Sequence, residues 1–229
     1  MTRPVVVIGG AGPTLGSALC NTFVSGDYQV VALSRGNTPS EKDMPASVHH
    51  VSCDLTDGDE VFTKIRDVEE SIGHIAAYVH NLGAFAQAPF LESDALQFEQ
   101  LWKVNCLSAY HAAKAVIAEM VDNSGGSIVF VGATASVKGS AGFAAFAAAK
   151  FALRGMAQAL AREFGPEGIH IAHVVIDGVM WGDRPRSWGM KQEQCLQPGA
   201  VAETIRHLVE QERSAWTHEL DIRPDVETF

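Results

Sequence analysis

Short runs of apolar residues recur along the chain, and longer segments that mix apolar and polar positions separate them. The runs are PVVVIGG, YQVVALSR, VHHVSCDL, IAAYVHNLG, SIVFVGAT, HIAHVVIDG and HELDIRP, at residues 4–10, 28–35, 48–55, 75–83, 127–134, 170–178 and 218–224. Nearly continuous apolar strands have both faces buried, which is typical of a parallel sheet between two layers of helices. The pattern predicts an α/β fold with a doubly wound parallel sheet of about seven strands and helices on both faces.

The segments between these runs predict helices, and the clearest cover residues 15–26, 97–121 and 142–164. No internal repeat, low-complexity tract or Pro/Ser-rich linker divides the chain, so we expect one domain over residues 1–229. The stretch GDRPRSWGMKQEQCLQP, residues 182–198, is polar and broken by Pro and Gly, and it shows no clear period. Such a segment is predicted to be a mobile substrate loop, which we call the lid.

The composition is that of a protein with one large buried core, because 47% of its 229 residues are hydrophobic. The formal net charge is -10 and no Lys/Arg cluster forms a basic stripe, which argues against nucleic acid or an anionic membrane as a partner. The longest apolar runs fall far short of the ~20 residues that span a bilayer, and the first residues make a poor secretory signal. Four scattered cysteines predict buried thiols rather than disulfides or a metal site: Cys20, Cys53, Cys106 and Cys195. We therefore expect a cytoplasmic protein without a metal.

A glycine-rich segment, IGGAGPTLGSAL, follows the first predicted strand and precedes the first helix; we call it the glycine turn. Glycines let a backbone approach a pyrophosphate closely, and the start of a helix offers free N–H groups and the positive end of its dipole. The turn therefore predicts a Rossmann-type dinucleotide site that contains Gly10, Gly12, Thr14, Leu15 and Gly16. Thr14 stands where a further glycine is usual, and its hydroxyl either touches a phosphate or caps the helix.

The ends of the next two predicted strands carry polar side chains at the same edge of the sheet. Ser34 and Arg35 end the second strand, where an acidic residue would bind the ribose hydroxyls of NAD. A Ser-Arg pair instead suits the 2′-phosphate of NADP, and an exposed Arg without a ligand is the alternative. Asp54 and Leu55 end the third strand, where the carboxylate either accepts a hydrogen bond from adenine or caps the next helix. NADP(H) is therefore predicted in preference to NAD(H).

Six motifs in this order resemble the short-chain dehydrogenase/reductase family, and the similarity covers almost the whole chain. GGAGPTLG resembles the family's TGxxxGxG, FAAAK has the spacing of its YxxxK, and SIVFVGATAS resembles the strand that delivers its catalytic Ser. HNLG resembles NNAG and keeps Asn81 and Gly83, and VNCLSAY carries Asn105 at the place of the family's catalytic Asn. The Asp-Gly that ends at Gly178 stands where Pro-Gly precedes the substrate loop. The resemblance thus adds Asn81, Gly83, Gly178 and Val179 to the predicted cofactor residues.

The resemblance gives a role to Lys150, which lies on an apolar helix where a lone Lys would otherwise reach out to water. The family's Lys binds the nicotinamide ribose and lowers the pKa of a Tyr one helical turn earlier. That Tyr gives a proton to the substrate carbonyl, a Ser polarises the same oxygen, and the Asn, here Asn105, holds a water behind the Lys. In this chain Phe146 occupies the Tyr position and Ala133 the Ser position, so both hydroxyls are missing. The resemblance leaves Asn105 and Lys150 as catalytic residues, with Lys150 also binding the cofactor.

Other departures from the family concern the lid and two histidines. Gly182 or a near neighbour stands where family members often have a Thr that contacts the nicotinamide carboxamide. Trp181 and Trp188 either line a substrate pocket or form the apolar side of the lid. His80 and His173 lie at strand ends or within strands and are interpreted as packed histidines.

Two functional hypotheses follow. In the first, the chain is an NADP-dependent oxidoreductase with a non-standard active site, whose proton comes from water relayed by Lys150 and Asn105 or from the substrate itself. In the second, it is an inactive NADP(H)-binding sensor, scaffold or partner subunit, which explains the missing hydroxyls most simply. The glycine turn disfavours a third, a structural domain with an empty site.

Both hypotheses imply a small-molecule substrate or ligand, whose determinants we expect in residues 84–96 and 182–198. The family resemblance also implies a homodimer or homotetramer, formed through the helices predicted over residues 97–121 and 142–164.

Overall fold

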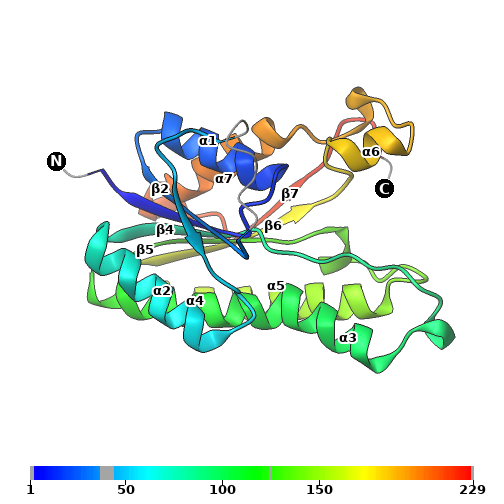
Figure 1. Ribbon diagram of the computed structural model, residues 1–229, viewed down its shortest axis with the longest axis horizontal. Coiled ribbons are helices and arrows are strands. Elements are labelled where there is room, and N and C mark those ends of the chain that lie inside the picture. Colours follow the sequence, from blue (N-terminus) through cyan, green and yellow to red (C-terminus); the bar gives the residue numbers. More distant parts are fainter. Residues whose placement is uncertain (1–2, 37–43, 124, 228–229) are drawn as a thin grey trace.

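The computed structural model describes residues 3–36, 44–123 and 125–227, and a seven-stranded parallel sheet lies at its centre (Figure 1). The strands are β1 (Val5–Gly9), β2 (Gln29–Ser34), β3 (His49–Ser52), β4 (Ile75–His80), β5 (Gly126–Val131), β6 (Ile169–Ile176) and β7 (Glu219–Ile222). Their order is β3-β2-β1-β4-β5-β6-β7, and every neighbouring pair is parallel. The chain runs outward from β1 to β3 and then crosses back to β4, so the predicted doubly wound fold is confirmed.

Helices cover both faces of this sheet (Figure 1). On one side lie α1 (Leu15–Ser25), α7 (Pro198–Val209) and the short α6 (Asp183–Ser187) of the lid. On the other side lie α2 (Gly58–Ser71), α3 (Ala95–Trp102), α4 (Ser108–Asp122) and α5 (Ala144–Phe164). No helix in the described part of the chain has both the length and the apolar character needed to cross a bilayer.

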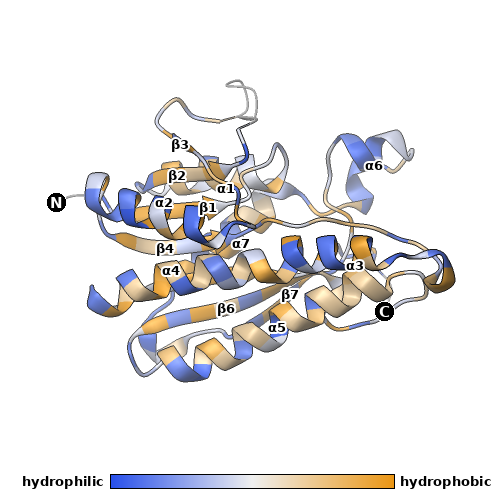
Figure 2. Ribbon diagram, turned by 60° about the horizontal axis from the view of Figure 1, so that its bottom comes forward, coloured by the Kyte–Doolittle hydropathy of each residue, from blue (hydrophilic) through white to orange (hydrophobic). Residues whose placement is uncertain are grey.

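Two apolar layers, one on each face of the sheet, form the core. Along β1, Val5 and Val7 belong to the layer under α2, α4 and α5, whereas Val6 and Ile8 belong to the layer under α1 and α7. This alternation follows from the two-residue period of a strand. Figure 2 shows the strands mainly in hydrophobic colours and α6 as strongly hydrophilic. The predicted buried thiols are confirmed, because Cys20, Cys53, Cys106 and Cys195 are all free and buried.

The strands stop earlier at their carboxyl ends than the apolar runs predict. β3 ends at Ser52, so Asp54 and Leu55 follow the strand instead of ending it. β4 ends at His80, which leaves residues 81–83 in a loop. The apolar runs continue beyond the last hydrogen bonds between strands, because the residues that follow β3 and β4 line a cavity at the edge of the sheet.

Helical structure covers the residues 97–121 predicted as a helix, but it is not uniform, because α3, a π-helical turn and α4 follow one another without a gap. The π-helical turn covers Lys103–Leu107 and contains Asn105. A π turn adds one residue to a helical turn and shifts the faces of the helix that follows it. The side chain of Asn105 forms hydrogen bonds to the loop after β4, as described below. The π-helical turn therefore accompanies a contact between segments that are distant in sequence.

Both helix-capping alternatives are wrong. Thr14 occupies the N-cap position of α1 but makes no capping hydrogen bond with its side chain. The cap of α2 is Asp57, whose carboxylate accepts the backbone N–H groups of Asp59 and Glu60. Thr14 and Asp54 therefore serve other contacts.

Candidate active site

A cavity of about 720 Å³ lies at the carboxyl ends of the strands, where the order of the sheet reverses at β1. Its walls come from the glycine turn, the ends of β2 and β3, the loops after β4, β5 and β6, and the lid. Ligands of open α/β sheets bind at such a switch point. The sequence-predicted residues that line it are Gly10, Gly12, Thr14, Leu15, Gly16, Ser34, Arg35, Asp54, Leu55, Asn81, Gly83, Gly178 and Val179.

The glycine turn is packed so closely that three of its glycines leave no room for a side chain, and a Cβ on Gly9 would clash with the Tyr78 hydroxyl. A Cβ on Gly10, whose φ is +84°, would lie 2.5 Å from the backbone N of Leu82, and a Cβ on Gly16 would lie 2.7 Å from the backbone of Ala11. A Cβ on Gly12 would meet no atom within 4 Å, and Gly12 lines the cavity. The turn is thus held rigidly from behind and presents open space beside a helix start, which suits phosphate groups.

Two asparagines hold the loop that follows β4. Asn81 donates from Nδ2 to the backbone O of Gly10 at 2.9 Å. Asn105 is fully buried, accepts from the backbone N of Ala84 at 3.2 Å, and donates from Nδ2 to the O atoms of Ala84 (2.9 Å) and Leu101 (3.0 Å). The side-chain amide of Asn105 is therefore committed to backbone groups, so a water relay at this place would use the backbone of the π turn.

At the β2 and β3 end of the cavity, a carboxylate and a guanidinium lie together. Oδ1 of Asp54 accepts the backbone N–H of Thr56 at 2.9 Å and its hydroxyl at 2.8 Å. These hydrogen bonds, assisted by the charge of Arg35, hold the pKa of Asp54 below its usual range. The end of the cavity thus offers an ionised acceptor for an amino group and, from Arg35, a cation for a phosphate.

The glycine turn and the lid meet at Thr14 and Gly182. A Cβ on Gly182 would lie 3.4 Å from Oγ1 and 3.5 Å from Cγ2 of Thr14. The backbone of Gly182 is extended, with φ 172°, so its conformation does not require glycine. A Cβ at position 182 would make ordinary van der Waals contact with Thr14, so packing does not require glycine there either, and both residues line the cavity.

Lys150 is buried, with 5% of its surface exposed, so it does not reach out to water. Its Nζ donates to the backbone O of Val131 at 3.1 Å and lies 3.7 Å from the position of a Cβ on Gly83. Burial lowers the pKa of Lys150 to about 8, and the nearby thiol of Cys106 opposes this shift. Lys150 therefore places its amino group directly behind the cavity wall at Gly83.

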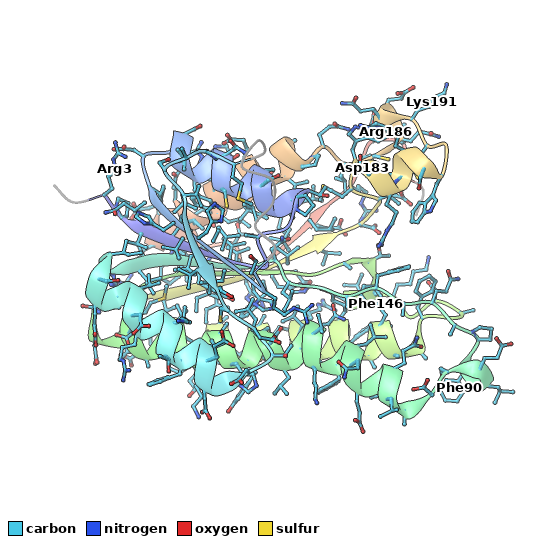
Figure 3. The ribbon with its side chains drawn as sticks, viewed as in Figure 1. Arg3, Phe90, Phe146, Asp183, Arg186 and Lys191 are labelled. Carbon is cyan, nitrogen blue, oxygen red and sulfur yellow. The ribbon has the colours of Figure 1, made fainter. Side chains whose placement is uncertain are left out.

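Three phenylalanines meet around Phe146, the residue that the resemblance aligned with the family's catalytic Tyr, and we call them the aromatic corner. The ring of Phe85 lies 5.4 Å from that of Phe146, edge to face, and 5.6 Å from that of Phe143. Phe85 and Ala133 line the cavity, and the Phe146 ring lies 6.0 Å from Nζ of Lys150. Figure 3 shows Phe146 between α5 and the lid. No hydroxyl belongs to this corner.

The hydroxyl groups next to Ala133 do not replace the missing Ser. β5 ends at Val131, and a 3-10 turn follows over Thr134–Ser136. Thr134 Oγ1 donates to Asp177 Oδ1 at 2.6 Å, and Ser136 is fully buried with its Oγ accepting the backbone N–H of Ala133 at 3.1 Å. Neither residue lines the cavity.

The two histidines are packed in the interior, as interpreted from the sequence. His80 lies between the Tyr78 hydroxyl (2.9 Å) and the Ser108 hydroxyl (3.1 Å), and burial together with the charge of Lys150 lowers its pKa to about 3. His173 is likewise fully buried, and burial lowers its pKa to about 4. Both imidazoles are therefore neutral near pH 7. In residues 3–36, 44–123 and 125–227, no group of three or more His, Cys, Asp or Glu side chains could hold a metal ion.

Sequence patterns did not single out Phe85 or Arg184, which also line the cavity. Both fall within the segments 84–96 and 182–198 that were expected to determine the substrate. Trp188 lines the cavity as well, whereas Trp181 packs under the guanidinium of Arg186, 5.4 Å from ring to charge, and is not part of the wall.

Comparison with known proteins places this geometry in one family. Residues 4–182 match the family model described as short chain dehydrogenase. The chain is 28% identical to the 3-oxoacyl-[acyl-carrier-protein] reductase MabA of Mycobacterium bovis over 201 residues, 88% of this chain and 77% of that one. It is 34% identical to a cyclic-di-GMP-binding biofilm dispersal mediator protein of Escherichia coli over 176 residues, 74% of this chain and 70% of that one.

Solved structures agree. A short-chain dehydrogenase from Rhodopseudomonas palustris is similar with TM-score 0.82 and 32% identity, covering 96% of this chain and 98% of that one. ElxO with NADP bound has TM-score 0.89 and 22% identity, covering 97% and 98% of the two chains.

Proposed function

The chain belongs to the short-chain dehydrogenase family, and we propose that it is an NADP(H)-dependent oxidoreductase with a non-standard active site. The observation that carries the proposal is the cavity, which joins Arg35, the open face of the glycine turn and Gly83 in front of Lys150. These three places suit the 2′-phosphate, the pyrophosphate and the nicotinamide ribose of one dinucleotide. The bound cofactor would supply a hydride donor beside the aromatic corner.

The preference for NADP over NAD rests on Ser34 and Arg35. Both line the cavity just past β2, where a 2′-phosphate would gain a charge-assisted hydrogen bond from the guanidinium. Asp54, held ionised by Thr56, would accept from the adenine amino group in the same region. The ElxO structure, which shares the fold, was solved with NADP bound.

Without the hydroxyls of the family's Tyr and Ser, reduction of a carbonyl would lack its usual proton donor and oxyanion donor. Each oxyanion donor is worth about 3–4 kcal/mol of transition-state stabilisation, and general acid catalysis contributes ~10²–10⁴-fold. Phe146 and Ala133 supply neither. We propose that a proton, where the reaction needs one, comes from water through Lys150 and the backbone at Asn105, or is carried by the substrate.

The second candidate function is an NADP(H)-binding sensor, scaffold or partner subunit without turnover. Phe146 and Ala133 favour it, because a protein that only binds the cofactor needs no proton donor. The Escherichia coli relative is named for binding cyclic di-GMP, so that nucleotide belongs among the ligands to test.

Titration of the protein with NADPH and NADH, followed by nucleotide fluorescence, tests the binding half of the proposal. We expect NADPH to bind at least about tenfold more tightly, the effect of a contact worth ~1.5–3 kcal/mol. Lys150→Ala should weaken NADPH binding because the ribose contact is lost. Equal affinities for the two nucleotides would contradict the NADP assignment, and unchanged affinity in Lys150→Ala would contradict the role of Lys150.

Turnover then separates the two candidates. Consumption of NADPH with a panel of carbonyl and related acceptors indicates an enzyme, and tight NADPH binding without consumption indicates a sensor or partner.

We further propose a homodimer or homotetramer in the cytoplasm. Exposed apolar side chains on α4 and α5, including Tyr110 (47% exposed), Val121 (44%) and Phe151 (43%), support an interface through these helices. A monomer mass in light scattering at micromolar concentration would refute it.

A further inference from the structure

The part of the cavity next to the aromatic corner is lined by carbon. Ala133 presents a methyl group, Phe85 a ring and Trp188 an indole, while Gly83 and Gly132 present only backbone. Among the polar liners, Ser34, Arg35 and Asp54 come from the ends of β2 and β3, which the strand order places on the other side of β1, and the lid adds Asp183 and Arg184. A substrate at the corner therefore meets an apolar wall.

The ionisable groups behind this wall do not present an acid to a substrate oxygen. Lys150 directs Nζ to the O atom of Val131, and His80 is a neutral imidazole enclosed between two hydroxyls. The thiol of Cys106 is buried, and burial raises its pKa. Arg184 lines the cavity from the lid, but a guanidinium keeps its protons at neutral pH.

Hydride transfer to a ketone leaves an alkoxide, which needs a positive or hydrogen-bonding partner and then a proton. Hydride transfer to an iminium ion leaves a neutral amine, which needs neither. An apolar wall opposes ketone reduction, which would separate an alkoxide from the nicotinamide cation, and it favours a step that only moves one positive charge from the substrate to the nicotinamide. The faces of aromatic rings also attract a cation.

We propose, on the basis of the proposed NADP(H) function, that the hydride acceptor at this site is an iminium ion held against the aromatic corner. One hydride, with its two electrons, passes from C4 of the nicotinamide to the iminium carbon. A C–H bond forms, and the π pair of the C=N⁺ bond becomes the lone pair on nitrogen. The iminium ion and NADPH become a tertiary amine and NADP⁺, and no proton is transferred.

Charge around the site is compatible with a cationic substrate. The protein carries a net charge of -10, which attracts cations at long range. Two cations oppose it: Lys150, whose Nζ is turned to Val131, 6.0 Å from the Phe146 ring centre, and Arg184, which lines the cavity from the lid. The Phe85 ring stands in front of Phe146 on the cavity side, where it would face the cation.

A matched pair of acceptors tests the proposal. The iminium ion 2-methyl-3,4-dihydroisoquinolinium and the ketone 1-tetralone share a bicyclic frame and differ in the group that is reduced. Each is incubated with the purified protein and NADPH that carries deuterium on one face of C4. Stereospecific deuterium transfer, measured by mass spectrometry of the product, distinguishes catalysis from the background reaction in protein-free buffer.

Two substitutions locate the effect. Phe85→Leu keeps an apolar side chain but removes the ring, and we expect kcat/KM for the iminium ion to fall about three- to thirtyfold, the range of a cation–π contact. Phe62→Leu, on α2 and outside the cavity wall, is the matched control and should leave the rate unchanged.

Stereospecific reduction of the iminium ion, with reduction of the ketone at least about a hundredfold slower, is the expected result. Comparable ketone reduction by the natural protein overturns the proposal, because it reveals a proton donor. Tight NADPH binding with no reduction of either acceptor also overturns it, and leaves the sensor function standing. Absence of NADPH binding defeats the proposed function itself, and the iminium proposal with it.

Discussion

The two ends of the cavity differ in chemical character although one sheet carries both. Around the glycine turn and past β2 and β3, the wall keeps the groups that a dinucleotide phosphate and adenine need, including Arg35 and Asp54. Past β4 and β5, the wall includes Ala133 and the Phe85 ring, and Phe146 of α5 packs behind Phe85. The difference teaches that cofactor binding and catalysis can be separated on this fold. The strand ends and the helix start would form the binding site, and a few side chains would decide the chemistry.

The largest expected effect comes from restoring hydroxyls to the apolar end. Phe146→Tyr with Ala133→Ser should raise reduction of small activated ketones by about 10²–10⁴-fold, because a general acid and an oxyanion donor are regained. Phe146→Tyr alone should give part of this, since Lys150 already lies one turn away to lower the phenol pKa. Initial rates of NADPH oxidation measure it. No gain in either variant would mean that the corner does not face the nicotinamide.

The next prediction compares how the buried Lys150 and an exposed lysine affect the pH dependence of the free energy of unfolding. Burial lowers the pKa of Lys150 from the ordinary lysine value of 10.5 to about 8 in the folded protein. The unfolded state binds more protons between these values, so the contribution of Lys150 to stability is fully present above about pH 10.5 and is lost as the pH falls to about 8.

Lys150→Met should abolish this pH-dependent contribution, which amounts to about 3 kcal/mol. Denaturant unfolding of the cofactor-free protein between pH 7.5 and 10.5, relative to Lys150→Met, measures it. Lys114→Met, at an exposed position on α4, is the control. A flat difference between the natural protein and Lys150→Met would contradict the buried ammonium.

Arg35→Ala tests the cofactor end alone. We expect NADPH to bind about tenfold or more weakly and NADH to bind as before, because one charge-assisted contact to the 2′-phosphate is lost. The ratio of the two dissociation constants measures it. An unchanged ratio would contradict the contact with the 2′-phosphate and would show that Arg35 is an exposed side chain without a ligand.

The smallest expected effect concerns the contact between the glycine turn and the lid, where the Thr14 side chain lies within van der Waals reach of a side chain at position 182. Thr14→Gly and Gly182→Thr should each weaken NADPH binding a few-fold, the first by removing a hydroxyl and the second by crowding Thr14. The double variant should recover part of the loss, with a coupling energy of about 1 kcal/mol in a double-mutant cycle. Strictly additive effects would show that side chains at the two positions do not make this contact.

The strand ladder and the glycine turn were predictable because their signals are local. Four consecutive apolar residues in β1 need both faces of a sheet covered, and glycines between a strand and a helix give phosphate-sized space in almost any context. The correspondence of Phe146 and Ala133 to the family's Tyr and Ser comes from the resemblance of the motifs around them, and it stays a prediction.

Tertiary structure decided what depends on contacts between distant segments. The π turn interrupts a helical pattern because Asn105 bonds to Ala84, 21 residues earlier, and no local propensity records that bond. Thr14 faces Gly182 instead of capping α1, and Phe85 meets Phe146 from a different loop. Local sequence determined which residues this protein has at the carboxyl edge of its sheet. Only packing determined which of them touch, because contact between distant segments depends on how the layers close and not on the preferences of either segment.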